Sequence, residues 1–227
     1  GGARWGLEGG PGRVVAGGQV SGLVASGGGV GVQGEDRRIH IWGELRAIGT
    51  AAQPVLFENT RLVPRGTEQN GALVRIQFAI LEGGTLFAPA IAGVPPGTIY
   101  ASLALTDSRI RNLANSIRLS FPVADCIIAR NVFEDSGGID TVLRLAQKVT
   151  IENNVFIRPS NNYAVRNIVR LDTSDTVLRH NSFLSTDRVA VTLSNIQADA
   201  SLDARQNYWN TTDPNVIRQM VHDAADD

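Results

Sequence analysis

Four arginines recur at one place in a short repeated pattern, each between two apolar residues. They are Arg75, Arg118, Arg144 and Arg170, and the last three follow one another at intervals of 26 residues. If the repeats are neighbouring strands of one sheet, these side chains lie about 4.8 Å apart from strand to strand. Guanidinium groups at that distance repel one another unless an anion lies between them. The spacing therefore predicts a ladder that binds the carboxylates of an acidic polysaccharide, because arginine binds carboxylates in a bidentate way.

Two alternatives remain open for this arginine column. Local pairing with Asp140, Asp172 and Asp175 would neutralise the guanidinium groups without a ligand. Alternatively, the long side chains fan out into solvent, where their repulsion is screened. Either arrangement would leave the column without a binding role.

A second column of polar residues could support proton transfer. It consists of Asp107, Arg130, Asn153, His180 and Gln206, with Glu134, Glu152, Arg179 and Arg205 beside it. An arginine, a histidine and carboxylates within a few strands are the groups that acid–base chemistry requires. The acids are scattered over different columns, however, and no cluster of Asp residues offers a calcium site. We therefore interpret this column as an exposed ladder and predict no catalytic residue.

No metal or cofactor site follows from the sequence. His40 and His222 lie too far from His180 to share a metal ion with it in any strand register. The single cysteine, Cys126, occupies an inward strand position and is most simply a small buried hydrophobic residue. Phosphate-loop, dinucleotide and Gly-x-Ser-x-Gly motifs are absent from the sequence. We therefore predict neither a metal nor a cofactor.

Internal repeats of about 25 residues predict the architecture. Five segments have mostly apolar residues at their first and third positions, Asn or Ser at the sixth and a large apolar residue at the eighth: 103–110, 126–133, 149–156, 176–183 and 202–209. Short alternating triplets lie between them, at 117–119, 143–145, 169–171 and 191–193. Two short strands per repeat, without a helical period, indicate a β-solenoid. We predict an all-β chain with coils of about 23–27 residues stacked into parallel sheets.

Two ladders should run through the stacked coils. The recurring aromatic residues are expected to form one internal stack of Phe133, Phe156, Phe183 and Trp209. The residues at the sixth position of the repeat should lie at the bends, and they are Ser108, Asn131, Asn154, Asn181 and Asn207. Asn suits a bend because it tolerates the left-handed backbone region, and its amide can bond the Asn of the next coil.

The N-terminal segment and one loop depart from the repeat. Residues 1–34 hold 14 of the chain's 24 glycines and predict either an irregular first coil or a covering strand. The β-helix itself should span 35–212, with an apolar, Pro-rich loop insertion at 85–98. Long ordered loops in compact folds are often functional, although this one could equally cover a sheet or contact another subunit.

The C-terminal segment, 213–227, should form a short helix and a tail. Asp213 followed by Pro214 is typical of a helix start, and apolar residues then recur at helical spacing. We expect a helix from about 214 to 223 that covers the open edge of the last coil.

Composition and charge argue against two classes of partner. The 227 residues carry 21 Lys and Arg against 22 Asp and Glu, a net charge of −1. This balance argues against general electrostatic binding to nucleic acid. No apolar run approaches the roughly 18–20 residues of a membrane-spanning helix, so we expect no membrane insertion.

The repeated units resemble those of a known family. Segments such as ARNVFED, IENNVFIR and LRHNSFLS are similar to the coils of right-handed parallel β-helix proteins of the pectin-lyase-like type. Residues 39–60, IHIWGELRAIGTAAQPVLFENT, are similar to the opening coil of many bacterial surface members. The resemblance covers roughly 35–227 and implies a right-handed coil and a place outside the cell or on a bacterial surface. It implies no activity, because the family contains lyases, hydrolases, epimerases, adhesins and scaffolds.

Three functions fit the sequence. The first is a non-catalytic extracellular β-helix module, a surface scaffold, adhesin or glycan-binding domain that is part of a larger chain. The alternative is a polysaccharide lyase or glycoside hydrolase acting on an acidic polysaccharide, which would need two carboxylates about 5–10 Å apart, or a base and a cation, in one groove. The second alternative is a self-assembling filament or surface-layer subunit. The expected partners are accordingly an acidic polysaccharide, other copies of the chain or other surface proteins.

Overall fold

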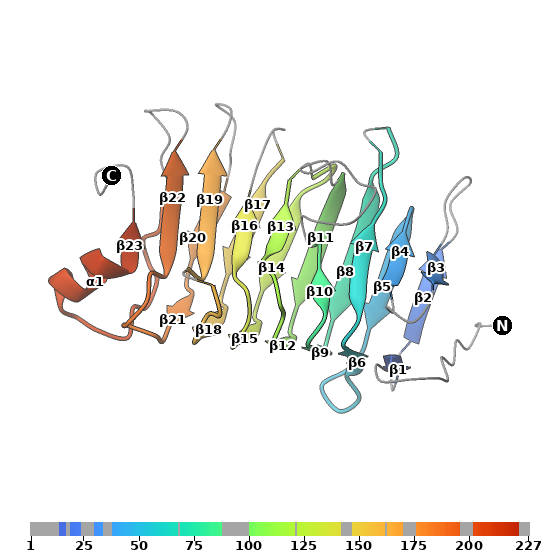
Figure 1. Cartoon of the computed structure of the whole chain (residues 1–227), viewed down its shortest axis with the longest axis horizontal. Helices are drawn as coiled ribbons and strands as arrows, with labels where there is room; N and C mark the ends of the chain where they lie inside the picture. The colour runs from blue at the N-terminus through green and yellow to red at the C-terminus, as the bar shows by residue number, and fades with distance from the viewer. Residues whose placement is uncertain are drawn as a thin grey trace.

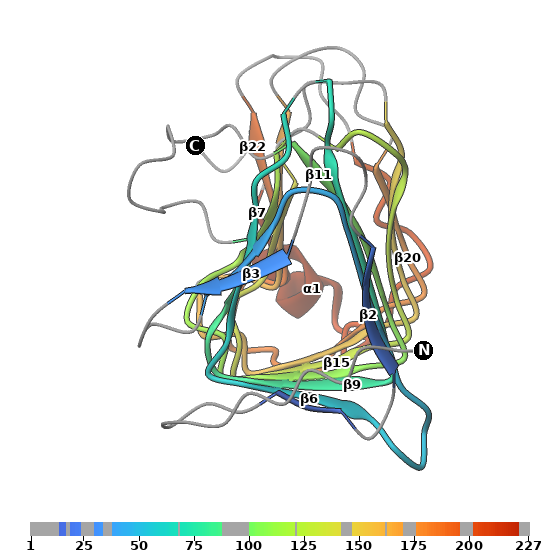
Figure 2. The same cartoon turned by 90° about the vertical axis from the view of Figure 1, so that its right-hand side faces the viewer.

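The chain forms a parallel β-solenoid of about five turns, with coils of about 26 residues (Figure 1). The fold comes from a computed structural model that describes residues 14–16, 19–23, 30–33, 38–67, 69–87, 100–120, 122–141, 147–161, 163–169, 176–195 and 202–222. Viewed along its long axis, the coil outlines a triangle with strands on each side (Figure 2). The predicted fold class and coil length are therefore confirmed.

Two seven-stranded sheets form two sides of the triangle. The first sheet consists of β1 (Val14–Ala16), β6 (Val55–Glu58), β9 (Ala79–Glu82), β12 (Arg109–Arg111), β15 (Val132–Glu134), β18 (Val155–Ile157) and β21 (Ser182–Phe183). The second sheet consists of β2 (Gln19–Leu23), β5 (Glu44–Ile48), β8 (Ala72–Gln77), β11 (Ala101–Thr106), β14 (Cys126–Ala129), β17 (Val149–Glu152) and β20 (Thr176–Arg179).

Two shorter sheets follow one another along the third side (Figure 1). The third sheet consists of β3 (Val30–Gln33), β4 (Arg38–Ile41), β7 (Arg61–Pro64) and β10 (Thr85–Leu86). The fourth sheet consists of β13 (Ile117–Leu119), β16 (Ile139–Thr141), β19 (Val165–Val169), β22 (Val191–Asn195) and β23 (Val221–His222).

The core runs along the axis because inward positions are in register from coil to coil. Successive side chains of a strand point to opposite faces, so every second residue faces the interior. In the first sheet the register joins Leu81 to Phe57 and to Ile110, and Ile110 to Phe133. None of these four side chains is more than 3% exposed. Stacking therefore buries apolar surface that no single coil could bury alone.

The predicted aromatic stack is confirmed. The rings of Phe133 and Phe156 have centroids 5.0 Å apart and lie within 13° of parallel. Phe156 stacks on Phe183 at 5.2 Å, and Phe183 stacks on Trp209 at 5.0 Å. Offset stacking at such distances adds attraction to the burial of the rings.

The predicted Asn ladder is confirmed, but the left-handed residues of the bend are not the ladder residues. Asn131, Asn154 and Asn181 are no more than 1% exposed, and each bonds the Asn of the next coil. Positive φ angles of 53–61° occur one residue earlier, at Asp107, Arg130, Asn153, His180 and Gln206. The amide that bonds along the ladder must point inward, so the preceding residue makes the turn of the chain.

Within residues 1–34, three strands cover the first coil. β1 pairs antiparallel with β6, β2 with β5 and β3 with β4, whereas pairing from β4 onward is parallel. These three strands therefore lie along the open edges of three sheets, which would otherwise be free to pair with another chain.

The loop insertion expected at 85–98 begins as a strand. Thr85 and Leu86 form β10, which pairs in parallel with β7, and both Leu86 and Phe87 are fully buried. Residues 88–99 lie outside the described residues.

A short helix follows the last coil, as predicted. It is α1 (Pro214–Met220), and the side chain of Asp213 accepts a hydrogen bond from the backbone N–H of Asn215 at 2.9 Å. Met220 is fully buried against the core. The helix ends earlier than expected because Val221 and His222 form β23, which extends the fourth sheet beside β22.

Candidate functional site

The predicted arginine column differs from the row that the fourth sheet forms. Arg118 pairs in register with Asp140, Asp140 with Arg166, and Arg166 with Thr192. The sequence pattern placed the triplets 143–145 and 169–171 beside 117–119. They lie four residues beyond 139–141 and 165–167, the segments that form the row in the structure. An acidic residue between two arginines removes the repulsion that an all-arginine column would suffer.

The other three members of that column are placed as follows. Arg75 lies on β8 of the second sheet, where it pairs in register with Arg46 and Ala104, so it does not share a row with Arg118. Its Nε lies 3.4 Å from Glu44 Oε1. Arg144 and Arg170 lie outside the described residues, and anion binding at these positions stays a prediction.

Asp140 is the buried centre of the row on the fourth sheet. It is 3% exposed, and Arg166 Nη2 donates to its Oδ2 at 2.7 Å. The guanidinium carbon of Arg166 lies 4.7 Å from the centre of the Tyr163 ring. Burial, opposed in part by a hydrogen bond with Ser116 and assisted by the charge of Asp140, raises the pKa of Tyr163. The carboxyl group of Asp140, the guanidinium group of Arg166 and the phenol of Tyr163 therefore lie together on this face.

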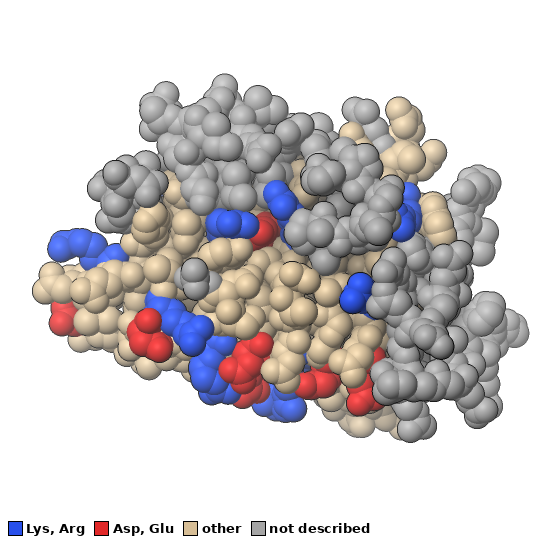
Figure 3. Space-filling view, viewed as in Figure 1, with Lys and Arg blue, Asp and Glu red and all other residues tan. Residues whose placement is uncertain are grey.

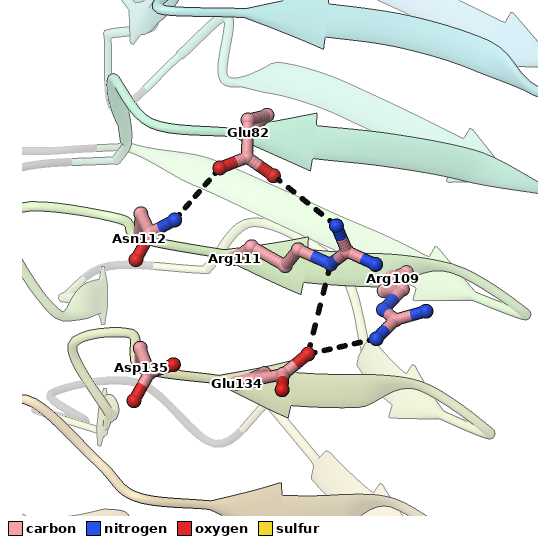
Figure 4. A pocket seen from close by; sticks show the side chains of 6 residues that line it. All are labelled: Glu82, Arg109, Arg111, Asn112, Glu134 and Asp135. Atoms are coloured by element: carbon pink, nitrogen blue, oxygen red, sulfur yellow. Dashed lines mark hydrogen bonds and ion pairs between the residues drawn. The ribbon is translucent and has the colours of Figure 1, made fainter.

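The first sheet carries a shallow polar depression of about 290 Å³ on its outer face. Its lining comes from three neighbouring strands and the turns after them, namely Glu82, Arg109, Arg111, Asn112, Glu134 and Asp135 (Figure 4). Arg111 stands on β12 between Glu82 on β9 and Glu134 on β15 (Figure 4). In Figure 3 basic and acidic side chains gather along the lower edge of the molecule, where these strands lie in Figure 1.

Ion pairs and hydrogen bonds connect the lining residues. Arg111 Nη1 lies 3.9 Å from Glu82 Oε2, and Arg111 Nε lies 3.6 Å from Glu134 Oε2. Arg109 Nη2 donates to Glu134 Oε2 at 2.8 Å, and Asn112 Nδ2 donates to Glu82 Oε1 at 2.7 Å. The contacts hold donors and acceptors in fixed positions on a surface that water can reach.

Arg158, on the turn after β18, completes this network. Its Nη2 donates to Glu134 Oε1 at 3.1 Å and to Asp135 Oδ2 at 2.8 Å. Hydrogen bonds from Arg109 and Arg158 lower the pKa of Glu134, and the one from Arg158 lowers the pKa of Asp135. Asp135 and Glu134 in turn raise the pKa of Arg158. All these groups are therefore charged at neutral pH.

The outer face continues from the depression toward the C-terminal end. In register with Arg109 lie Val132, Val155, Ser182 and Tyr208. Tyr208 is 56% exposed, and four strand spacings place it about 19 Å from Arg109. A flat strip of small side chains thus connects a charged depression with an exposed aromatic ring.

The second predicted column lies at the corner between the first two sheets. Asp107 accepts two hydrogen bonds from Arg130, at 2.6 and 2.8 Å, and a third from Gln77 at 3.0 Å. The bonds from Arg130 lower the pKa of Asp107. Arg179 donates to Glu152 at 3.1 Å. Ion pairs between coils thus join Asp107 to Arg130 within this column and Arg179 to Glu152 beside it.

The depression on the first sheet was not predicted from the sequence. The sequence does contain a pattern that marks it: the position directly after each inward-facing apolar residue of the first-sheet strands is charged. In successive coils this position holds Glu58, Glu82, Arg111 and Glu134. Only a correct register shows that opposite charges are neighbours there.

Three further observations bear on the predicted chemistry. Cys126 is fully buried, as expected, and burial raises the pKa of its thiol to about 11. Among the described residues no group of three or more His, Cys, Asp or Glu side chains is placed to hold a metal ion. No helix in the described part of the chain is long and apolar enough to cross a membrane.

Comparison with known proteins gives no match: no family model matches the sequence, and no curated protein or solved structure matches the chain. The fold and the two polar sites define the class, which is a parallel β-solenoid with ion-paired outer faces.

Proposed function

We propose that this protein is a non-catalytic β-solenoid module that binds carbohydrate on the outer face of its first sheet. The observation that carries the proposal is the depression between Glu82 and Glu134, where fixed donors and acceptors alternate on a shallow, accessible surface. Sugar hydroxyls both donate and accept hydrogen bonds, so neighbouring Arg, Asn and Glu side chains complement them.

The strip beyond the depression supports a ligand that extends over several sugar units. Val132, Val155 and Ser182 leave a low surface between Arg109 and Tyr208. An exposed tyrosine offers an apolar ring face with a polar hydroxyl, which suits an interface that is partly wet. The three arginines and three carboxylates of the network balance in charge, which favours a neutral glycan on this face.

A binding role fits these carboxylates better than a lyase or hydrolase does. A general acid must be protonated near the working pH, which requires a raised pKa. The arginines lower the pKa of Glu134 and Asp135 instead. Arg111 also stands between Glu82 and Glu134, in the space where a glycosidic bond would have to lie (Figure 4).

The finer family assignment and the location belong to the same proposal. We infer a right-handed coil of the pectin-lyase-like type from the similarity of the repeated units and from the strong preference of parallel strand connections for that hand. The resemblance of residues 39–60 to bacterial surface proteins supports a scaffold or adhesin outside the cell. Self-assembly has less support, because the exposed Ile48 and Ile127 of the second sheet are separated by β8 and β11.

A glycan array with neutral and acidic glycans, followed by titration calorimetry on the hits, tests the proposal. Arg109→Gln should weaken binding about tenfold, because it removes a charged hydrogen-bond donor. Arg179→Gln is the matched control, since its side chain is 51% exposed against 48% for Arg109 and also bonds one glutamate. Equal effects of the two changes, or no glycan hit, would contradict the proposal, and shortened glycan products would show an enzyme.

A further inference from the structure

Arg118 carries a charge that no described residue compensates. In the part of the chain that the structure describes, no hydrogen bond or ion pair reaches its guanidinium group, and its Nε is buried without a partner. The side chain as a whole is only partly buried, and its two terminal nitrogens are not among the buried unpartnered atoms. Nε of Arg111 and of Arg166 is likewise buried without a partner, but their terminal nitrogens lie against carboxylates, whereas those of Arg118 meet no acceptor among the described residues. The terminal nitrogens of Arg118 are therefore open to an acceptor that a ligand would supply.

The neighbouring acid does not supply that partner. Asp140 is next to Arg118 in the register, but its Oδ2 accepts from Arg166 at 2.7 Å and its Oδ1 has no hydrogen-bond partner. Arg166 thus neutralises Asp140, and the row of three charged side chains keeps one net positive charge at Arg118. A partly desolvated cation without a counter-charge is costly, so an anion that binds it gains more than it would at an open surface.

We infer that Arg118 is a binding site for a single carboxylate group of a ligand. The planar guanidinium fork matches the two oxygens of a carboxylate. With Nε buried, only the terminal nitrogens can meet an incoming group, which fixes the direction of approach. This differs from the ladder expected from the sequence, because one arginine binds one carboxylate instead of a row binding a polymer.

The charge of Asp140 selects a monoanion over a dianion. Its strand lies about 4.8 Å from that of Arg118, and its Oδ1, which no hydrogen bond reaches, faces an incoming anion with negative charge. One net positive charge attracts a dianion such as sulfate or phosphate twice as strongly as a carboxylate, whereas the cost of removing the dianion from water grows with the square of its charge. We therefore expect acetate to bind more tightly than sulfate.

The surroundings of Asp140 hold this arrangement rigid. Asn161 Nδ2 donates to Ser116 Oγ at 2.6 Å, and Ser116 Oγ lies 3.2 Å from the Tyr163 hydroxyl. Arg166 lies over the Tyr163 ring while it bonds Asp140. Arg166 is therefore held toward Asp140 and is not free to take the ligand in place of Arg118. Rigid neighbours reduce the entropy lost on binding.

The test is an NMR titration of the backbone amides of residues 117–119 and 139–141 with acetate at constant ionic strength. We expect a saturable shift that sodium chloride does not reproduce and that sulfate reproduces only at higher concentration. Arg118→Gln should abolish the shift. Arg118→Lys should weaken acetate binding about tenfold, because it keeps the charge but loses one hydrogen bond of the fork.

Matched variants separate this site from the one on the first sheet. Arg109→Gln should leave the acetate titration unchanged, since it lies on another sheet. Retention of the shift in Arg118→Gln, an equal response to chloride, or tighter binding of sulfate would overturn the inference. Loss of glycan binding in Arg109→Gln would leave it intact, so the two proposals fail independently.

Discussion

Asn131 donates two hydrogen bonds to a single oxygen of Asn154 in the next coil. Its backbone N–H and its Nδ2 both lie 3.0 Å from Asn154 Oδ1. Asn154 bonds Asn181 in the same way, and its own Nδ2 also donates to the carbonyl of Ile128 at 2.8 Å. Because these side chains exclude water, the ladder satisfies backbone groups that the bend leaves without strand partners.

Replacing Asn154 with alanine should therefore be costly. The change removes hydrogen bonds to both neighbouring coils and leaves the backbone N–H of Asn131 buried without an acceptor. We expect the free energy of unfolding to fall by about 3 kcal/mol, measured by urea denaturation. Asn115→Ala, at an exposed position, is the control and should change it by less than about 0.5 kcal/mol. Similar values for the two variants would contradict a stabilising role of the ladder.

The repeat made this part of the fold predictable. A residue that recurs once per coil must meet its own copies when coils stack, so spacing alone brought Asn131 beside Asn154 and Phe133 beside Phe156. The start of the helix was equally local, because Asp213 and Pro214 act on the backbone next to them.

The row on the fourth sheet could not be predicted by the same reasoning. A triplet of one arginine between two apolar residues is common, and it matched at 143–145 although 139–141 pairs with β13. The length of the bend before each strand decides whether 139–141 or 143–145 pairs with β13, and a three-residue motif does not encode that length. The charge pairs of the first sheet depend on the same information, because Arg111 and Glu134 are 23 residues apart in sequence and adjacent only in the correct register.

His180 should respond to substitution through its backbone and not through chemistry. Its φ angle is 54° and its side chain is exposed. His180→Val should lower the free energy of unfolding by about 1–2 kcal/mol relative to His180→Gly, because only glycine adopts this region without steric cost. Thermal denaturation of both variants measures the difference. A loss of glycan binding in a folded His180→Gly protein would instead show that the His180 side chain contributes to binding.

Cys126 should resist thiol reagents as long as the protein is folded. Its thiol is buried and its pKa is raised to about 11, so little thiolate forms at pH 8. Labelling with a thiol reagent, with and without urea, measures the reactivity. Rapid labelling without urea would contradict the inward orientation.

The raised pKa of Cys126 also makes the stability of the fold depend on pH. The unfolded chain releases the thiol proton at a lower pH than the folded chain, so the free energy of unfolding declines as the pH rises from about 9 to about 11. Cys126→Ala should show a weaker decline at high pH.

The ion pairs of the first sheet should stabilise the fold at neutral pH and lose that effect in acid. Glu134 and Asp135 have lowered pKa values in the folded chain, against ordinary values of 4.5 and 3.8. Their contribution is therefore complete above those values and disappears as the pH falls through the lowered ones. Glu134→Gln keeps the shape but not the charge, so wild type should exceed it in unfolding free energy at pH 7, and the difference should shrink toward pH 3. Urea denaturation across this range measures it, and a difference that stays constant with pH would show that packing, not charge, holds Arg109 and Arg158 in place.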